Sequence, residues 1–487
     1  MDETNDIIQS RDEQWRVDLR ASRSPKERTA IERVAMPQLD PQYRVTCNEE
    51  VNRGITAEQA MREATRCLDC NNPQCVTGCP VGINIPKFIK NIERGDFAQA
   101  AATLKQTSSL PAVCGRVCPQ EKQCESHCIH LKMKHPAVAI GYLERFAADW
   151  QREHGAEEPA RRPASNGIKV AVVGSGPAGL SFAGDMAKLG YEVTVFEALH
   201  EIGGVLKYGI PEFRLPNAIV DHEIDGLRQM GVTFVKNCII GRTVTIDELC
   251  RQGYKGVFVA SGAGFPRFMD IPGENLSGVM SSNEYLTRIN LMEAGRGGDT
   301  PVMRGRVIAV VGGGNTAMDS ARTARRMGAE RVILVYRRSE AEMPARLEEV
   351  GHAKEEGVEF MTLHNPVEYL GDERGRVRAM RVQRMELGEP DASGRRSPVP
   401  VEGAVEDIAV DLVIVAVGVS PNQLVPRSVP GLEVSRRNTI VVDDNTMQSS
   451  VPFLYAGGDI VRGGATVILA MGDGRRAALN MANALLG

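Results

Sequence analysis

Two stretches of the chain share the same order of apolar and polar positions. Residues 168–197 begin with an apolar run, continue through a glycine-rich turn and a helical pattern, and end with a second apolar run closed by an acid. Residues 306–338 repeat this plan. Apolar strands joined by a glycine-rich turn and a helix are typical of nucleotide-binding βαβ units. The two copies are too far apart for a solenoid repeat, so the sequence predicts two separate nucleotide-binding domains.

The patterns on either side of these units differ from them. Residues 1 to about 150 are rich in charged residues and helix formers, with turn residues around the cysteines, which predicts a helical domain. A polar linker follows at about 152–167. The final stretch reads as a strand, a Gly-Gly-Asp turn and a long amphipathic helix, which would complete the first nucleotide domain around an inserted second one. The predicted α/β chain has a helical domain at 1–152, a first nucleotide domain at 166–300 and 426–487, and an inserted nucleotide domain at 301–425.

Charge and hydropathy exclude several classes of protein. The 487 residues include 58 basic and 62 acidic side chains, with a formal net charge of -4. This balance creates no field that would indicate binding to nucleic acid or to an anionic membrane. The first residues are acidic and polar, and no run approaches the roughly 20 apolar residues of a membrane span. We therefore expect a cytoplasmic protein with no membrane span and no nucleic-acid partner.

Eight of the eleven cysteines form two runs before residue 130. The first run has the spacing C-x2-C-x4-C-x3-C-P, which lets several thiolates bind one iron–sulfur cluster while the next cysteine serves a second. In a reducing compartment, clustered cysteines are more often metal ligands than disulfides. Zinc would usually need a C-x2-C pair in each knuckle, and the second run contains none. Spacing alone therefore favours two all-cysteine iron–sulfur clusters, with Cys114 included.

The remaining candidate ligands receive simpler interpretations. His127 and His130 flank Cys128, but surface histidines are the commoner outcome at such positions. Cys238 and Cys250 are separated by eleven residues and have no close redox partner in the sequence. This spacing disfavours a dithiol reductase, which needs a cysteine pair beside its flavin. We expect both to be small buried residues and Cys47 to be structural.

The first glycine-rich turn has the pattern G-x-G-x-x-G at Gly174, Gly176 and Gly179. The first glycine permits a tight turn, the second lets the backbone approach a pyrophosphate, and the third lets the helix pack against the strand. Glu197 ends the second strand, where a carboxylate can accept hydrogen bonds from ribose hydroxyls. A purely structural glycine turn is the alternative. The context of strand, turn and helix favours a dinucleotide site.

The second glycine-rich turn contains Gly312, Gly314 and Ala317. Its second strand is followed by Arg337 and Arg338 rather than by an acid. Guanidinium groups suit a ribose 2′-phosphate, so NADP(H) is favoured over NAD(H). Two solvated arginines at a strand end are the alternative interpretation.

Between the two units, residues 201–216 contain glycines and prolines that fix an irregular backbone path. Such a loop could line a flat ring. Its apolar side chains would cover the ring, and its free backbone amides would bond ring heteroatoms. Those side chains are Tyr208, Ile210, Pro211 and Leu215.

These segments together resemble the NADPH-dependent glutamate synthase small subunit family. The resemblance runs from about residue 45 onward and rests on RCLDCNNPQCVTGCPVGINIP, LPAVCGRVCPQEKQCESHC, VAVVGSGPAGL, GGVLKYGIPEFRLP, VVGGGNTAMDSARTARRMGA, VYRRSEAEMPA and AGGDIVRGGATVILAMGDGRRAA. Similar proteins include the flavin subunits of sulfide dehydrogenase and of ferredoxin-dependent NADP transhydrogenase, and the N-terminal part of dihydropyrimidine dehydrogenase. The resemblance implies a helical iron–sulfur domain followed by glutathione-reductase-like FAD and NADPH domains.

The resemblance also implies that ligands from the two cysteine runs interleave. One 4Fe-4S cluster would use Cys67, Cys70, Cys75 and Cys128. The second would use Cys79, Cys118, Cys124 and a non-cysteine ligand, which is similar in position to Glu144. Cys114 would then bind no iron. An ordinary surface carboxylate is the alternative for Glu144.

Further cofactor contacts follow from the same resemblance. Asp459 would accept a hydroxyl hydrogen bond in the ribityl and phosphate region, and the start of the last helix would lie near the pyrimidine edge of the flavin. The predicted FAD residues are Gly174, Gly176, Pro177, Ala178, Gly179, Glu197, Gly204, Leu206, Tyr208, Ile210, Pro211, Arg214, Leu215, Gly262, Gly458, Asp459, Thr466 and Val467. The predicted NADPH residues are Gly312, Gly314, Asn315, Thr316, Ala317, Arg337 and Arg338. No residue is expected to transfer a proton.

The function implied is that of an NADPH-oxidising iron–sulfur flavoprotein. FAD would take hydride from NADPH, and two 4Fe-4S clusters would carry single electrons to a partner. The chain shows no glutaminase or FMN barrel, so glutamate formation from glutamine, 2-oxoglutarate and NADPH would require a glutamate synthase large subunit. Alternatives are the flavin subunit of a transhydrogenase or sulfide dehydrogenase, with another flavin or iron–sulfur partner, and, more remotely, a non-catalytic zinc-stabilised adaptor.

Overall fold

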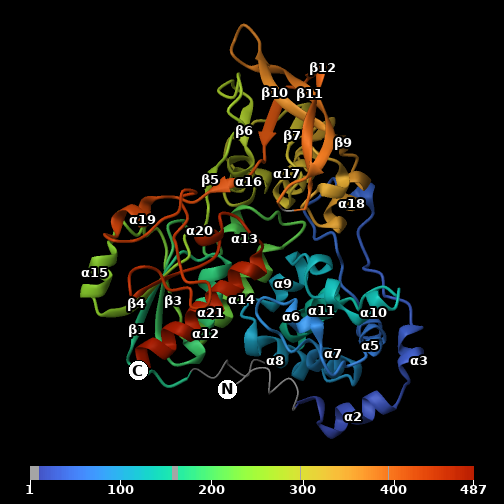
Figure 1. Ribbon diagram of the computed structural model, residues 1–487, viewed down its shortest axis with the longest axis vertical. Helices are drawn as coiled ribbons and strands as arrows, with labels where there is room; N and C mark the ends of the chain where they lie inside the picture. The colour runs from blue at the N-terminus through green and yellow to red at the C-terminus, as the bar shows by residue number, and fades with distance from the viewer. Residues whose placement is uncertain (1–9, 156–162, 297, 393, 487) are drawn as a thin grey trace.

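The computed structural model describes residues 10–155, 163–296, 298–392 and 394–486. Three parts of the protein lie against one another (Figure 1). A helical part is formed by the N-terminal third of the chain, and two α/β units follow it. The fold class predicted from the sequence is confirmed.

The helical domain is built from short, well-capped helices. Thr56 forms a capping box with Gln59 at the start of α5, and Asp96 accepts a hydrogen bond from the Gln99 amide at the start of α8. Prolines occupy the first turn of α7 and α9, where their missing N–H has no cost. The helices and 3-10 turns are α2 (Gln14–Ala21), α3 (Pro25–Thr29), α4 (Pro41–Arg44), α5 (Ala57–Thr65), α6 (Gln74–Thr77), α7 (Ile85–Glu93), α8 (Phe97–Thr107), α9 (Pro111–Val117), η1 (Gln120–Lys122), η2 (Glu125–His127), α10 (Ile129–Lys132) and α11 (Ile140–His154).

The first α/β unit contains a parallel five-stranded sheet in the order β15-β4-β1-β2-β3. Its strands are β1 (Lys169–Val173), β2 (Glu192–Phe196), β3 (Thr233–Val235), β4 (Tyr254–Val259) and β15 (Leu454–Ala456). Because β15 pairs with β4, the C-terminal segment completes a sheet begun almost 300 residues earlier. The associated helices are α12 (Pro177–Lys188), α13 (Val205–Tyr208), α14 (Asn217–Gln229), α15 (Ile246–Arg251), α19 (Leu424–Ser428), α20 (Asp459–Arg462) and α21 (Val467–Leu486).

The second α/β unit contains another parallel sheet, in the order β6-β13-β7-β8-β9. Its strands are β6 (Val279–Ser281), β7 (Val307–Val311), β8 (Arg331–Tyr336), β9 (Glu359–Thr362) and β13 (Leu412–Val415). Strand β6 already belongs to this sheet, on the N-terminal side of the boundary predicted at residue 301. The associated helices and 3-10 turns are α16 (Ser282–Asn290), η3 (Ala294–Arg296), α17 (Asn315–Arg326), η4 (Glu340–Glu342) and α18 (Leu347–Glu355).

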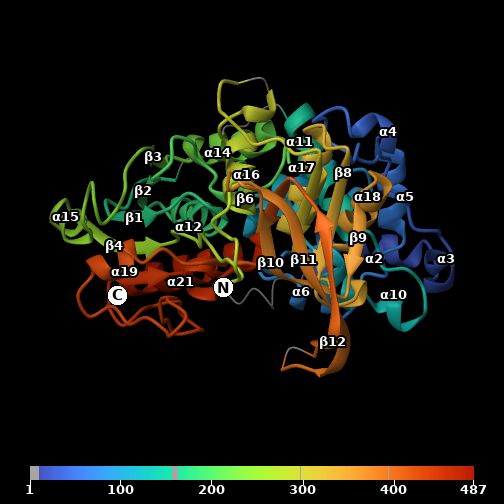
Figure 2. The same cartoon turned by 90° about the horizontal axis from the view of Figure 1, so that it is seen from above.

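An antiparallel sheet of three strands extends this second unit. It consists of β10 (His364–Gly371), β11 (Val377–Pro390) and β12 (Arg396–Ala409). Figure 2 shows β12 running out beyond the body of the protein. A short ribbon of β5 (Phe265–Pro266) and β14 (Val419–Ser420) joins the two passages of chain between the α/β units.

The helical domain and the first α/β unit share one apolar core. Phe88 of α7, Phe182 of α12 and Met471 of α21 belong to the same buried cluster, and all three are at most 1% exposed. A shared core fixes the cysteine-bearing loops relative to the first α/β unit. Within the described ranges, no helix has both the length and the apolar character needed to cross a bilayer.

Candidate functional site

A cavity of about 1590 Å³ runs between the two α/β units and reaches the helical domain. Both glycine-rich turns line it, together with Val117 and Pro119 on either side of Cys118. Most of the predicted cofactor residues also line it. Those that do not are Gly179, Leu206, Pro211, Leu215 and Ala317, all of which are buried.

The geometry of the first glycine-rich turn fits a bound pyrophosphate. Gly174 has φ +101°, and a Cβ there would lie 2.5 Å from the Ala260 carbonyl oxygen. A Cβ at Gly179 would lie 2.1 Å from the Gly174 oxygen. At Gly176, by contrast, a Cβ would meet no atom within 4 Å, although this residue lines the cavity. The first and third glycines are therefore required by packing, and the middle one leaves space for a ligand beside the start of α12.

Glu197 is held in place at the cavity wall. Its carboxylate accepts hydrogen bonds from the Ser175 amide at 2.9 Å, the Ser175 hydroxyl at 2.5 Å and the Leu199 amide at 2.8 Å. These contacts fix the carboxylate at the end of β2, where a dinucleotide ribose would lie. Ser175 was not predicted, because it lies between the first two glycines of the turn, at a position where the motif allows any residue and does not indicate a contact with Glu197.

The loop before α14 contributes both cavity wall and a link between the α/β units. Tyr208 and Ile210 line the cavity, and burial, with smaller effects from Asp459 and Glu197, raises the pKa of Tyr208 to about 12. Arg214, predicted to contact FAD, forms an ion pair of 2.9 Å with Asp319 of α17. Its guanidinium therefore joins the loop to the second α/β unit.

The C-terminal segment closes the first nucleotide site. Gly458, Asp459, Thr466 and Val467 all line the cavity, as does Gly262. Burial raises the pKa of Asp459, whose Oδ1 accepts a hydrogen bond of 2.9 Å from the amide of Ala465. The N-terminus of α21 faces the cavity, where its partial positive charge suits an electron-rich ring.

The second glycine-rich turn repeats the geometry of the first. A Cβ at Gly312 would lie 2.4 Å from the Ala416 oxygen, whereas the nearest atom to a Cβ at Gly314 is Pro344 Cγ at 4.0 Å. The middle glycine again leaves space for a ligand. The Asn315 side chain accepts a hydrogen bond of 2.9 Å from the Arg346 amide, and Thr316 lines the cavity.

The two arginines after β8 have different surroundings. Arg337 is exposed at the cavity edge. Arg338 is only 6% exposed and forms an ion pair of 2.7 Å with Asp391. Nothing in the sequence around β8 distinguishes the two arginines, since Asp391 lies 53 residues beyond Arg338 along the chain.

Cys67, Cys70, Cys75 and Cys128 lie close enough together for the charge on one to affect the pKa of another. Burial raises the pKa of the Cys75 thiol, and charge on Cys67, Cys128 and Cys70 raises it further. Burial likewise raises the pKa of Cys67 to about 12. Buried thiols with raised pKa values do not ionise readily by themselves, but a bound metal deprotonates them. This donor set fits an iron–sulfur cluster.

The second group contains Cys79, Cys118, Cys124 and Glu144. Burial raises the pKa of Cys79 to about 12, with Glu144 and Cys118 among its charged neighbours. Burial raises the pKa of Glu144 to about 8, and its Oε1 has no hydrogen-bond partner among the described residues. A buried carboxylate oxygen without a partner is costly unless it binds a metal, so this group also fits a cluster.

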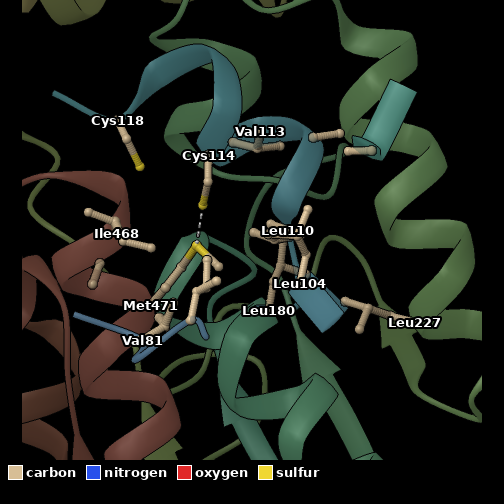
Figure 3. Packing of buried hydrophobic residues seen from close by; sticks show 14 of the residues in the cluster. Val81, Leu104, Leu110, Val113, Cys114, Cys118, Leu180, Leu227, Ile468 and Met471 are labelled. Carbon is tan, nitrogen blue, oxygen red and sulfur yellow. Dashed lines mark hydrogen bonds between the residues drawn. The ribbon is translucent and has the colours of Figure 1, made fainter. Parts of the chain in front are cut away.

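Cys114 adjoins the second group, where a hydrogen bond with the Cys118 side chain and burial raise the pKa of its thiol, and it also contacts helix α21. Its Sγ is 3.4 Å from Met471 Sδ, and Figure 3 shows the side chain pointing at that methionine. Among the described residues, no three Cys, His, Asp or Glu side chains converge on a single metal position. In a four-iron cluster each ligand binds a different iron, so the ligands surround a volume instead.

The second cysteine group lies against the wall of the first nucleotide site. A Cβ added at Gly472 of α21 would lie 2.8 Å from the Pro80 oxygen, directly after Cys79. Gln123, next to Cys124, donates a hydrogen bond of 3.4 Å to Thr466 Oγ1. The residues around this group therefore touch the helix whose N-terminus lines the cavity.

The N-terminal segment, residues 10–45, covers the first cysteine group. Asp69, between Cys67 and Cys70, is fully buried and has φ +49°. Its carboxylate pairs with Arg16 and Arg20, the latter at 2.7 Å. This segment, which sequence patterns left without a role, thus fixes the loop that carries two of the cysteines.

The other cysteines agree only partly with expectation. Cys238 is buried as predicted, but it also lines the cavity. Cys250 and Cys47 are only partly buried. His130 is buried against Arg66 instead of lying at the surface.

Comparison with known proteins identifies both halves of the chain. Residues 44–156 match the family model for dihydropyrimidine dehydrogenase domain II, 4Fe-4S cluster, and residues 168–474 match that for pyridine nucleotide-disulphide oxidoreductases. Over 65% of this chain, the fold is similar to that of FprA from Mycobacterium tuberculosis, with a TM-score of 0.55 and 21% identity over 84% of that chain.

Among curated proteins, the glutamate synthase (NADPH) small chain of Azospirillum brasilense is 38% identical, covering 88% of this chain and 90% of that protein. That of Escherichia coli (strain K12) is 37% identical, covering 93% and 97%. The NADP(+)-dependent formate dehydrogenase subunit beta of Moorella thermoacetica is 41% identical over 84% of this chain, but only 59% of that protein is covered.

These matches confirm the predicted resemblance and the prediction of an oxidoreductase with an iron–sulfur domain. They support an iron–sulfur cluster, a flavin and a pyridine nucleotide as its cofactors. The chain belongs to the pyridine nucleotide-disulphide oxidoreductases and, within them, to the glutamate synthase (NADPH) small chain family.

Proposed function

We propose that this protein is the electron-input subunit of an NADPH-dependent glutamate synthase. FAD would accept an electron pair from NADPH and release single electrons to two 4Fe-4S clusters, which would reduce a partner large subunit. The complete reaction would convert glutamine, 2-oxoglutarate, NADPH and a proton into two glutamates and NADP⁺. Membership of the family is the first reason for this assignment, and the geometry of the cavity supports it.

The observation that carries the proposal is the continuity of the site. One cavity contains both glycine-rich turns and reaches the residues that flank Cys118. A nicotinamide and a flavin bound at the two turns would thus meet between the α/β units, and the flavin would lie beside the second cysteine group. The chain's own residues bind and orient the cofactors, and none needs to transfer a proton.

We assign the cofactors to the predicted residues on the fit described above. The turn at Gly176, with Glu197 and Asp459, would hold FAD, and the turn at Gly314 would hold NADPH. The proposed domains follow the predicted limits of 1–152 for the clusters, 166–300 and 426–487 for FAD, and 301–425 for NADPH, except that the boundary at 300 moves to before β6 (Val279–Ser281), which pairs in the second sheet.

Cluster ligation follows the two groups of buried side chains. Cys67, Cys70, Cys75 and Cys128 would bind the outer cluster, beneath the N-terminal segment. Cys79, Cys118, Cys124 and Glu144 would bind the cluster next to α21. The strongest support for the second set is the buried Glu144 Oε1, which has no hydrogen-bond partner within the described part of the chain.

A second candidate is electron input to a different partner. The 41% identity to the formate dehydrogenase subunit beta indicates that similar chains serve other enzymes. A transhydrogenase or sulfide dehydrogenase partner belongs to the same class of alternative.

Copurification with activity measurement separates these candidates. The tagged chain, purified from its own cells, should bring a large partner, and that complex should form two glutamates per NADPH oxidised. The chain alone should reduce an artificial acceptor with NADPH but form no glutamate. A complex that oxidises NADPH but forms no glutamate from glutamine and 2-oxoglutarate would refute the glutamate synthase assignment.

A further inference from the structure

The turn between β11 and β12 brings another arginine to the NADPH side of the cavity. Arg395 lines the cavity together with Arg337, Arg338 and His364. This turn lies more than 50 residues beyond the end of β8 in the sequence. The fold therefore adds a guanidinium that the sequence pattern around β8 does not contain.

Arg338 anchors this turn to the end of β8. Its Nη2 forms an ion pair of 2.7 Å with Asp391 Oδ2, and its Nε donates a hydrogen bond of 2.8 Å to the Arg396 carbonyl oxygen. Both contacts are on the turn, one at each side of Arg395. Because β12 runs out beyond the body of the protein (Figure 2), these contacts are what hold the turn near the cavity.

Asp391 in turn fixes the backbone of Arg395. The Arg395 amide donates a hydrogen bond of 3.3 Å to Asp391 Oδ1, and the Asp391 amide donates one of 2.7 Å to the Arg395 carbonyl oxygen. The carboxylate of Asp391 therefore contacts both Arg338 and the backbone that carries the Arg395 side chain. Charge on Asp391 offsets that of Arg338, and the exposed Arg337 and the turn's Arg395 line the same edge of the cavity.

The position of this pair suits a phosphate on the adenosine ribose. A dinucleotide bound at the turn of Gly314 places its ribose 2′ position at the end of the second strand, which here is β8. Guanidinium groups bind phosphate through paired N–H donors and distinguish it strongly from a hydroxyl.

We propose that Arg395 binds the 2′-phosphate of NADPH together with Arg337, and that Arg338 is a positioning residue that holds the β11–β12 turn in place through Asp391. The inference rests on the proposed use of NADPH. It assigns the choice between NADPH and NADH partly to the antiparallel sheet, which the basic nucleotide-binding unit does not include.

Calorimetric titration of the FAD-loaded protein tests this assignment with NADP⁺, NAD⁺ and adenosine 2′,5′-bisphosphate as separate probes. Arg395→Ala should weaken binding of NADP⁺ and the bisphosphate about tenfold, as expected for loss of a hydrogen bond to a charged group, and should leave NAD⁺ unchanged. Arg396→Ala is the matched control. The Arg396 guanidinium donates to the Leu387 and Gly388 carbonyl oxygens along the hairpin, and its own carbonyl contact with Arg338 would remain.

The positioning role has its own readout. Asp391→Asn should reduce the ratio of NADP⁺ to NAD⁺ affinity, and Asp391→Glu should restore part of it, because the glutamate retains the charge that pairs with Arg338. A general loss of folding would weaken both nucleotides alike.

The outcomes separate this inference from the proposed function. Equal affinity of the wild-type protein for NADP⁺ and NAD⁺ would refute the assignment of NADPH itself. A wild-type preference for NADP⁺ that Arg395→Ala leaves intact would overturn only the role of Arg395, as would equal losses for both nucleotides.

Discussion

One added methyl group should have different effects at two glycines of the first glycine-rich turn. Gly176 has φ -70° and ψ -178°, which any residue adopts, and an added Cβ would meet no protein atom within 4 Å. Gly176→Ala should therefore fold without a clash and with little net change in stability, because the less flexible unfolded chain contributes about 0.4–1 kcal/mol while alanine is the poorer residue at this N-cap of α12. At Gly179 a Cβ would lie 2.1 Å from the Gly174 oxygen, so the backbone must shift at a cost of about 1–3 kcal/mol.

Although Gly176→Ala should not disturb the protein itself, it should weaken the binding of FAD. Its open space belongs to the cavity, where a pyrophosphate would approach the backbone. A methyl group forced into such a contact costs about 1–3 kcal/mol, which corresponds to about 5- to 150-fold weaker binding of FAD. At Gly314, where the nearest atom to a Cβ is 4.0 Å away, the same substitution should weaken NADP⁺ and spare FAD.

Two measurements on each variant test this reasoning. FAD affinity is obtained by reconstituting the flavin-free protein and following flavin fluorescence, and stability is obtained from the Tm of the flavin-free protein by circular dichroism. Gly176→Ala should lose FAD affinity at an almost unchanged Tm, and Gly179→Ala should lower the Tm. Wild-type FAD affinity in a folded Gly176→Ala protein would show that no pyrophosphate lies against this turn.

Further predictions concern the clusters and the buried charges. Glu144→Ala should lose the EPR signal of one cluster and keep full FAD, because it removes a ligand of only one; unchanged iron and EPR would reject that ligand. Cys114→Ser should keep all iron, and a lost cluster would show that the second ligand set is incorrect. Arg322→Met should lower the free energy of unfolding by up to about 3–5 kcal/mol in thermal melts, because it removes one of the arginines that pair with the buried Glu349 and Glu356 and leaves only Arg214 beside the first and Arg44 and Arg326 beside the second. Burial opposes the charge on Glu349, but Arg322 and Arg214 lower its pKa from 4.5 to about 2. The stabilisation from this charge should therefore be present above about pH 4.5 and disappear as the pH falls towards about 2. An unchanged dependence of stability on acid pH in Arg322→Met would contradict this.

The two nucleotide units were predictable because their signals are local. The turn at Gly174 and the acid at Glu197 lie within a single strand–helix–strand segment, and each has a meaning set by backbone geometry. The spacing of the two cysteine runs was likewise sufficient to predict iron–sulfur binding. The ligand sets proposed above could not be derived from spacing, which suggested all-cysteine clusters with Cys114 and gave no sign of Glu144; they rest on the family resemblance and stay a proposal.

Contacts between distant segments could not be predicted. Arg44 in the N-terminal segment forms an ion pair with Glu356, 312 residues later, and the role of Arg338 depends on Asp391 in another sheet. Single charged residues of this kind carry no periodic signal, so their pairing appears only when the fold brings them together.

Anaerobic purification followed by NADPH titration tests the central claim most directly. Iron, sulfide and FAD are measured in the purified chain, and the absorbance spectrum is recorded as NADPH is added. Two 4Fe-4S clusters predict about eight irons per FAD, and NADPH should bleach the flavin bands. Zinc in place of iron, or a bound flavin that NADPH cannot reduce, would contradict the assignment of the cysteine groups or of the second nucleotide site.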